Sequence, residues 1–148
     1  MYSTQTLLEA QYGRENIRKW ADLNNTGNAE EITARVNLAL ANADDLFDSM
    51  MREGPHRVPL EFAAPPIVIR IVNDIAADDL YTARGIQDID TNGEPVHRLS
   101  GARERAMRNL REILDGRLRL SDPTLTRPVP EFVTIETARD ADASSLTL

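Results

Sequence analysis

The amphipathic pattern between Asn28 and Glu53 constrains the fold more than any other feature of the sequence. Its apolar residues recur at steps of three and four, the spacing of one face of an α-helix. They are Ile32, Val36, Ala39, Leu40, Ala43, Leu46, Phe47, Met50 and Met51. Asn28 and Glu31 resemble a helix-capping box, and Gly54-Pro55 ends the pattern. We predict a helix of roughly 24 residues whose apolar face packs against other elements.

A second helix is predicted at Pro66–Arg84, and it is the best candidate for the centre of the fold. Pro66 suits the first turn of a helix, and Gly85 suits its end. The first half of the segment is apolar nearly all round. Such a helix is stable in water only when other elements cover it on several sides. We therefore expect it to be the buried central helix.

Three further helices complete the predicted fold. Short helices are expected from Ser3 or Thr4 to Tyr12 and at Glu15–Leu23, and a long one at Pro95–Asp115. The sequence therefore predicts an all-α fold of about five helices, in which two long amphipathic helices enclose the buried central one. We assign residues 1–118 to this helical domain.

Beyond Leu120 the sequence changes character. Pro123, Pro128 and Pro130 exclude a continuous helix, and the run PEFVTIET at Pro130–Thr137 is typical of a short extended segment. We therefore assign residues 119–148 to an extended C-terminal arm that orders against a partner or stays mobile. The arm residues predicted to contact that partner are Phe132, Val133 and Ile135.

Composition excludes several classes of protein. A net charge of −7 argues against a general affinity for nucleic acid or for anionic membranes. The chain has no cysteine, which excludes disulfides and thiolate catalysis. No run approaches the roughly 18 apolar residues of a membrane span, and the N-terminus lacks the pattern of a signal peptide. These features predict an acidic, soluble, cytoplasmic protein without membrane contact.

The segment from Asp88 to Gly93 resembles the start of a calcium-binding EF-hand loop. Asp88, Asp90 and Asn92 occupy the first, third and fifth positions, where such loops carry oxygen ligands. The twelfth position, which supplies a bidentate carboxylate, is Leu99. These three residues are therefore only a weak metal-site candidate, and a polar turn is the favoured interpretation.

No arrangement of residues in the sequence indicates catalysis. His56 and His97 stand apart, and no phosphate-binding loop or nucleophile motif occurs. Two groups of aspartates have helical spacing and could in principle form a two-metal site, although solvent-exposed helix faces are the favoured interpretation. They are Asp44, Asp45 and Asp48, and Asp74, Asp78 and Asp79. We expect a protein without enzymatic activity, cofactor or bound metal.

Charge is distributed unevenly between two predicted helices. Residues 28–53 carry a net charge of −4, and residues 96–119 carry +4. These helices could pair within one chain, meet head-to-tail between copies, or remain solvated. Arginine suits such contacts because its planar guanidinium group can form two parallel hydrogen bonds to one carboxylate. The candidate interface residues on these helices are Arg98, Arg105, Arg108, Arg111, Asp44, Asp45 and Asp48.

The order of these features resembles that of a known family. A Tyr-Ser-Thr opening, a Tyr-Gly turn and a Pro-Pro-Ile helix start precede IAADDLY at Ile75–Tyr81 and the arginine-rich run Arg103–Leu120. Over about residues 1–120 the chain is similar to Mu-like prophage proteins of a domain of unknown function, encoded among head and tail genes. That family often has an aromatic residue near the start of the last helix, where this chain has His97, Arg98 and Leu99.

The resemblance implies a structural protein of the virion. Similar head–tail connector subunits form a ring, usually of about twelve copies, beneath the portal protein. The expected partners are other copies, the portal protein and a tail-side stopper or terminator protein, and an acidic inner wall would let genomic DNA pass without sequence-specific binding. The expected location is the head–tail junction, and the host cytoplasm during assembly. The alternative is a small helical regulatory or ligand-binding domain that binds a metal or an anion.

Overall fold

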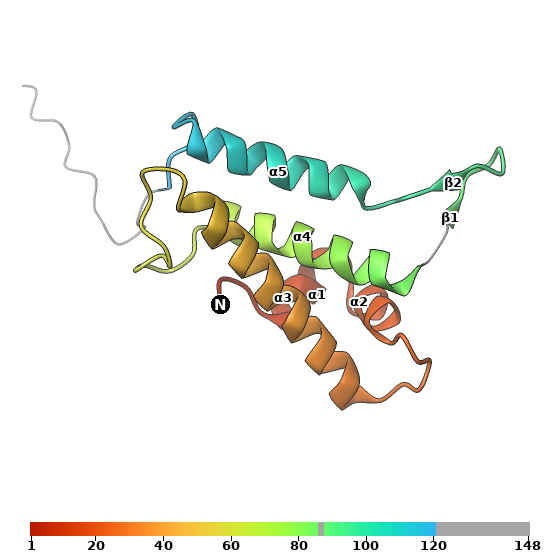
Figure 1. Ribbon diagram of the computed structural model, residues 1–148. Coiled ribbons are helices and arrows are strands. Elements are labelled where there is room, and N and C mark those ends of the chain that lie inside the picture. The colour runs from red at the N-terminus through yellow and green to blue at the C-terminus, as the bar shows by residue number, and fades with distance from the viewer. Residues whose placement is uncertain (86–87, 121–148) are drawn as a thin grey trace, which may run out of the picture.

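The structure, a computed structural model, describes residues 1–85 and 88–120 (Figure 1). Within these ranges it contains five helices and one short hairpin, which confirms the predicted all-α fold. The elements are α1 (Gln5–Tyr12), α2 (Arg14–Ala21), α3 (Ala29–Met51), α4 (Pro66–Arg84), β1 (Asp88–Ile89), β2 (Pro95–Val96) and α5 (Ser100–Leu114). The predicted arm beyond Leu120, with Phe132, Val133 and Ile135, lies outside the described residues.

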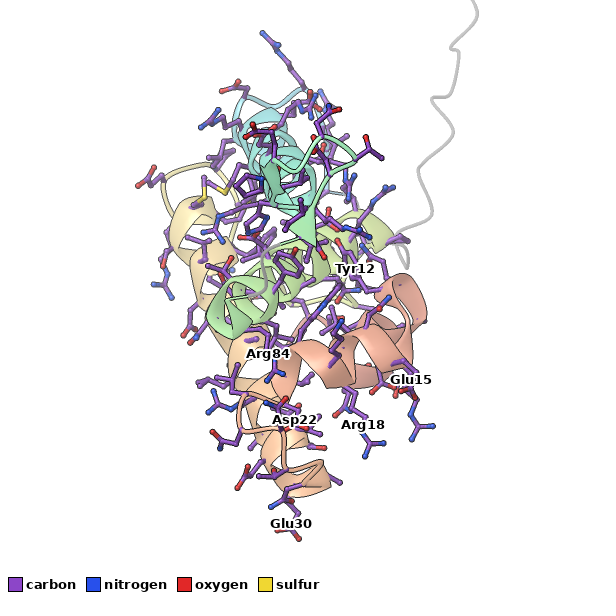
Figure 2. All side chains as sticks on the ribbon, turned by 90° about the vertical axis from the view of Figure 1, so that its right-hand side faces the viewer. Tyr12, Glu15, Arg18, Asp22, Glu30 and Arg84 are labelled. Atoms are coloured by element: carbon purple, nitrogen blue, oxygen red, sulfur yellow. The ribbon has the colours of Figure 1, made fainter. Side chains whose placement is uncertain are left out.

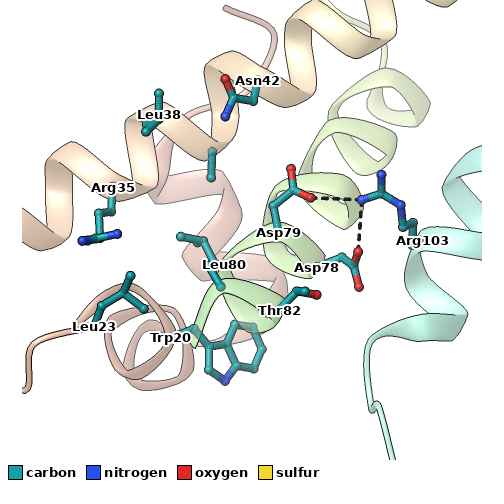
Figure 3. Close-up of a pocket in the computed structure, with 12 residues that line it drawn as sticks. Trp20, Leu23, Arg35, Leu38, Asn42, Asp78, Asp79, Leu80, Thr82 and Arg103 are labelled. Atoms are coloured by element: carbon teal, nitrogen blue, oxygen red, sulfur yellow. Dashed lines mark hydrogen bonds and ion pairs between the residues drawn. The ribbon is translucent and has the colours of Figure 1, made fainter. Parts of the chain in front are cut away.

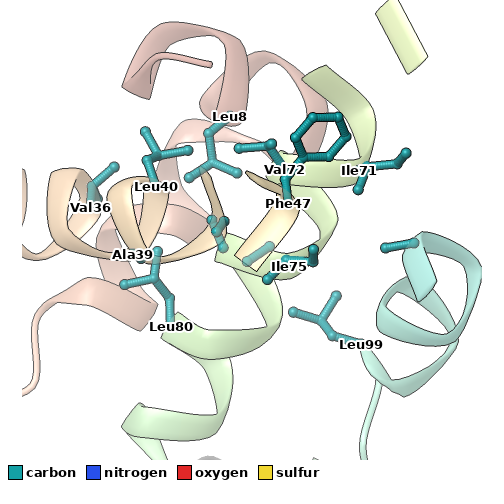
Figure 4. Packing of buried hydrophobic residues seen from close by; sticks show 14 of the residues in the cluster. Leu8, Val36, Ala39, Leu40, Phe47, Ile71, Val72, Ile75, Leu80 and Leu99 are labelled. Atoms are coloured by element: carbon teal, nitrogen blue, oxygen red, sulfur yellow. The ribbon is translucent and has the colours of Figure 1, made fainter. Parts of the chain in front are cut away.

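Helix α4 is the centre of the fold, as predicted. It contacts all four other helices, with α5 along one side and α3 crossing it at an angle on another (Figure 1). Ile71 and Ile75 of α4 are almost completely buried, and Phe47 of α3 is fully buried beside them (Figure 4). Each large apolar side chain buried in this way contributes about 1.5–3 kcal/mol to folding.

Local signals in the sequence determine where the helices begin and end. The Thr4 side chain accepts a hydrogen bond from the Leu7 amide at 3.3 Å, and the Asn28 side chain accepts one from the Glu30 amide at 3.0 Å. These bonds satisfy amides that have no partner inside the helix. Gly85 ends α4 in the left-handed conformation, with a φ of 68°, which glycine adopts without steric cost.

The start of the last helix differs from the prediction. Helix α5 begins at Ser100, not near Pro95, because Pro95 and Val96 form β2 and pair with β1 in an antiparallel ladder. The residues predicted to start this helix therefore form one strand of a hairpin that projects from the body (Figure 1). A local sequence pattern could not reveal this pairing.

The two ends of α3 have different surroundings. Its C-terminal half packs on α4, whereas its N-terminal end projects beyond the rest of the body (Figures 1 and 2). Glu30 lies at this projecting end (Figure 2). The Arg84 side chain at the end of α4 donates hydrogen bonds to the Asp22 carbonyl oxygen and to the Asn25 side chain, in the loop between α2 and α3. In the part of the chain that the structure describes, no helix has the length and apolarity needed to cross a membrane.

Candidate functional site

Two of the three α3 aspartates predicted to lie in an interface bind the N-terminal segment of their own chain. The nearly buried Asp44 carboxylate accepts the Tyr2 amide at 3.2 Å, and Asp48 accepts the Tyr2 hydroxyl at 2.5 Å. Burial raises the pKa of Asp44. Burial, together with the bond to Asp48, raises the pKa of Tyr2 to about 12. Asp44 and Asp48 therefore hold the N-terminal segment against α3.

A row of polar side chains on α4 fixes α1 and α5. Asn73 accepts the Ser3 hydroxyl at 2.5 Å and donates to the Gln11 side chain at 3.0 Å. Asp74, which is fully buried, accepts hydrogen bonds from Tyr12 at 2.5 Å and Gln11 at 2.7 Å. Its other oxygen lies 3.1 Å from two nitrogens of the Arg105 guanidinium. A buried carboxylate is tolerated because these donors replace its water.

Arg103 makes a second connection between α5 and α4. One of its guanidinium nitrogens lies 3.1 Å from Asp78 and 3.0 Å from Asp79 (Figure 3). Burial raises the pKa of Asp79, and the nearby arginine opposes that shift. The His97 ring lies 3.6 Å from the other oxygen of Asp78. The carboxylates of α4 therefore act as anchors for α5.

The interpretation of the α4 aspartates as a solvent-exposed face is wrong for two of the three. Asp74 and Asp78 are buried, and only Asp79 is substantially exposed. A sequence signal for this existed, because a carboxylate within a helix that is apolar nearly all round must be buried and must find cationic partners. No comparable signal pointed to Tyr2, whose role depends on tertiary packing alone.

The four arginines predicted to lie in an interface fall into two groups. Arg105 binds Asp74, and Arg98 lies 3.1 Å from Asp88 of the hairpin. Arg108 and Arg111 are exposed, and neither forms an ion pair with any residue in the described ranges. Asp45 of α3 is likewise exposed, and no ion pair to it occurs within residues 1–85 and 88–120. Arg105 of α5 thus binds α4, and Arg98, which precedes α5, binds the hairpin. Arg108, Arg111 and Asp45 lie at the surface.

The weak metal-site candidate forms the polar turn of the hairpin. Asp90 accepts the backbone amides of Asn92 at 2.8 Å and Glu94 at 2.9 Å. Asp88 accepts the Tyr81 hydroxyl and lies beside Arg98. Both carboxylates are thus engaged by donors of the chain. Within the described residues, no three His, Cys, Asp or Glu side chains converge in a way that could hold a metal ion.

Two open grooves adjoin each other, and Asp78 and Arg103 line both of them. The first has a volume of about 550 Å³ and lies between α2, α3 and α4, with Trp20, Leu38 and Leu80 among its lining residues (Figure 3). The second, which we call the α5 groove, has a volume of about 750 Å³. Its lining residues are Asp78, His97, Ser100, Arg103, Glu104, Met107, Arg108 and Arg111. Open, mixed surfaces of this kind suit contact with another macromolecule better than enclosure of a small substrate.

Comparison with known proteins supports the resemblance drawn from the motifs. A search of curated protein sequences gave no significant match. The model of one protein family, described as Bacteriophage Mu, Gp36, matches residues 2–135. The match extends past the described residues and includes Phe132, Val133 and Ile135 of the predicted arm. Since it covers most of the chain, the protein belongs to the bacteriophage Mu Gp36 family.

Proposed function

We propose that this protein is a head–tail connector subunit of a phage or prophage virion. In this role it assembles with other copies into a ring beneath the portal protein and completes the head before the tail joins. The observation that carries the proposal is that this phage-family chain divides its charged residues between paired groups inside the fold and exposed groups at the surface. Asp74 and Asp78 are neutralised inside the fold, whereas Asp45, Arg108 and Arg111 remain at the surface for other contacts.

A connector has to be rigid, because it transmits the position of the portal to the tail. The α4 polar row supports rigidity, since Asp74 binds residues of both α1 and α5. Buried polar networks whose members are all satisfied favour one arrangement of the elements. The role requires no catalysis, cofactor or metal.

Charge supports a channel that DNA can traverse. The chain carries a net charge of −7, and a ring of such subunits multiplies that charge around its axis. Negative walls repel the phosphate backbone, and this lowers the friction on a genome that must pass without sequence-specific binding. We propose the portal protein, a tail-side stopper or terminator protein and further copies of this chain as partners.

The C-terminal arm is the proposed link to a neighbour. Phe132, Val133 and Ile135 lie within the family match, and three apolar residues in so short a run are unusual for a solvated tail. Burying Val133 and Ile135 against a partner would contribute about 2–5 kcal/mol, part of which offsets the ordering of the segment. Adding a strand to a neighbour's edge is one mode of such binding.

The test is genetic complementation followed by electron microscopy. A phage or prophage lacking this gene should produce filled heads and free tails that do not join, and the full-length gene should restore joined particles. A gene encoding residues 1–120, and a full-length Val133→Asp/Ile135→Asp variant, should both fail to restore joining although their helical content is normal. Joined, infectious particles formed without any copy of the gene would contradict the proposal.

The groove along α5 favours one alternative function, the binding of a small anion by a regulatory domain. Arg108 and Arg111 supply positive charge there, while Glu104 opposes it. Isothermal titration of the full-length protein with phosphate or a dicarboxylate tests this alternative. Saturable binding that is lost in Arg108→Ala, in a protein absent from purified virions, would favour the regulatory domain.

A further inference from the structure

A line of exposed residues runs along the outer side of α3. Glu31, Leu38 and Asp45 are spaced by seven residues, nearly two helical turns, and therefore lie in one row about 10 Å apart along the axis. All three are exposed, and Leu38, which is 61% exposed, also lines the edge of the groove between α2, α3 and α4. Ala34 and Ala41 beside this row leave room for close approach. We call Glu31, Leu38 and Asp45 the outer ridge.

The α5 groove has the opposite charge around a similar apolar centre. Met107 is half-buried there, with Arg108 and Arg111 exposed beside it. Arg103 is paired with both Asp78 and Asp79, and among the exposed residues of the groove Glu104 offsets one of the two arginines Arg108 and Arg111. The exposed residues of the groove thus carry a net positive charge next to an apolar residue, and the outer ridge offers one carboxylate on each side of a leucine.

We infer that the outer ridge of one copy packs into the α5 groove of the next copy, with Leu38 against Met107 and Asp45 near Arg108. This inference rests on the proposed function and names the contact between subunits of the ring. Neither surface complements itself, because the ridge is acidic and the groove is basic. When each ridge enters the groove of a different neighbour the contact is head-to-tail, and repetition of a head-to-tail contact closes a ring when the rotation allows it. Glu31 lies near the projecting N-terminal end of α3 (Figure 1), and Leu38 and Asp45 are exposed farther along the helix, so a neighbour can reach the ridge.

Cysteine cross-linking tests this inference cleanly, because the chain has no cysteine of its own. Full-length Leu38→Cys and Met107→Cys variants are mixed in equal amounts at the highest soluble concentration, oxidised, and separated on a non-reducing gel. Peptide mapping identifies which positions are linked. We expect the 38–107 product to exceed both the 38–38 and the 107–107 products. Ile89→Cys is a matched control, since Ile89 is a 65% exposed apolar residue on the hairpin.

Charge reversal sharpens the test. Arg108→Glu in the Met107→Cys partner should lower the 38–107 yield at least about tenfold, because it places like charges opposite each other. Asp45→Arg in the Leu38→Cys partner should then restore the yield. Two outcomes would overturn the inference. One is a 38–107 yield no higher than the yield of cross-links in a mixture that contains Ile89→Cys. The other is a 38–38 or 107–107 yield larger than the 38–107 yield. Preferential linkage of Met107→Cys to Val133→Cys would also overturn it, and would assign the groove to the arm.

The same variants separate this inference from the proposed function. If purified virions contain the protein but the 38–107 link does not form in them, the assignment of the interface fails and the connector role stands. If purified virions lack the protein, the connector role fails whatever links form in solution.

Discussion

Arg105 and Arg108 lie less than one turn apart on the same helix, and the structure gives them different surroundings. Arg105 is bonded to the fully buried Asp74, whereas Arg108 is exposed and forms no ion pair within the described ranges. The difference comes from the side of α5 on which each residue lies, since only one side faces α4. A buried carboxylate that loses its cation is strongly destabilising, whereas exposed charge pairs contribute about 0–1 kcal/mol. Arg105 therefore contributes to stability, and we propose that Arg108 of the same helix serves assembly.

The largest expected effect comes from a carboxylate placed on α4 without a partner. Ile71→Asp puts a charge at a fully buried position one turn before Asp74. We expect the domain to unfold, because burial of an unpaired charge costs several kcal/mol. Circular dichroism and thermal melting measure this effect. An unchanged melting temperature would contradict the placement of Ile71 in the core of the fold.

Removal of the cation that binds Asp74 should have the next largest effect. Arg105→Ala should destabilise the fold by on the order of 3 kcal/mol, because Asp74 then stays buried with only Tyr12 and Gln11 as donors. Arg108→Ala is the matched control and should change the free energy of unfolding by less than about 0.5 kcal/mol. Urea unfolding of both variants measures the difference. Equal effects of the two substitutions would remove the distinction between them.

A smaller effect is expected in the pH dependence of stability. Burial raises the pKa of Asp79 in the folded state, so the native protein binds this proton more tightly than the unfolded chain does. Stability from this group is then present at low pH and is lost as the pH rises through the raised pKa. Asp79→Asn should flatten that part of the profile while keeping an acceptor for Arg103. An identical profile for the variant and the natural protein would contradict this assignment.

Calcium should have the smallest effect. The hairpin carboxylates Asp88 and Asp90 are already engaged by Arg98, Tyr81 and backbone amides, and Leu99 stands where a bidentate ligand is needed. Millimolar calcium should therefore leave the melting temperature unchanged. A rise of several degrees that Asp88→Ala abolishes would identify the hairpin as a metal site.

The helices could be predicted because their periodicity and end signals are local. Pro66 and Gly85, for example, mark the two ends of α4 in the sequence itself. The start of α5 could not be predicted in this way, since it depends on pairing between residues 88–89 and 95–96. The concentration of arginines in residues 96–119 could be recognised in the sequence, but only the packing of α5 on α4 separates Arg105 from Arg108. The role of Arg108, Arg111 and Asp45 in an interface stays a prediction.

Complementation with an Arg108→Glu/Arg111→Glu variant tests the central claim most directly. In a phage or prophage that lacks the gene, this variant should accumulate with a normal free energy of unfolding and yet yield unjoined heads and tails. Arg108→Lys/Arg111→Lys, which keeps the charge, should restore joined particles and serves as the control. Joined particles at the natural yield from the Arg108→Glu/Arg111→Glu variant would contradict the claim that these exposed arginines serve assembly.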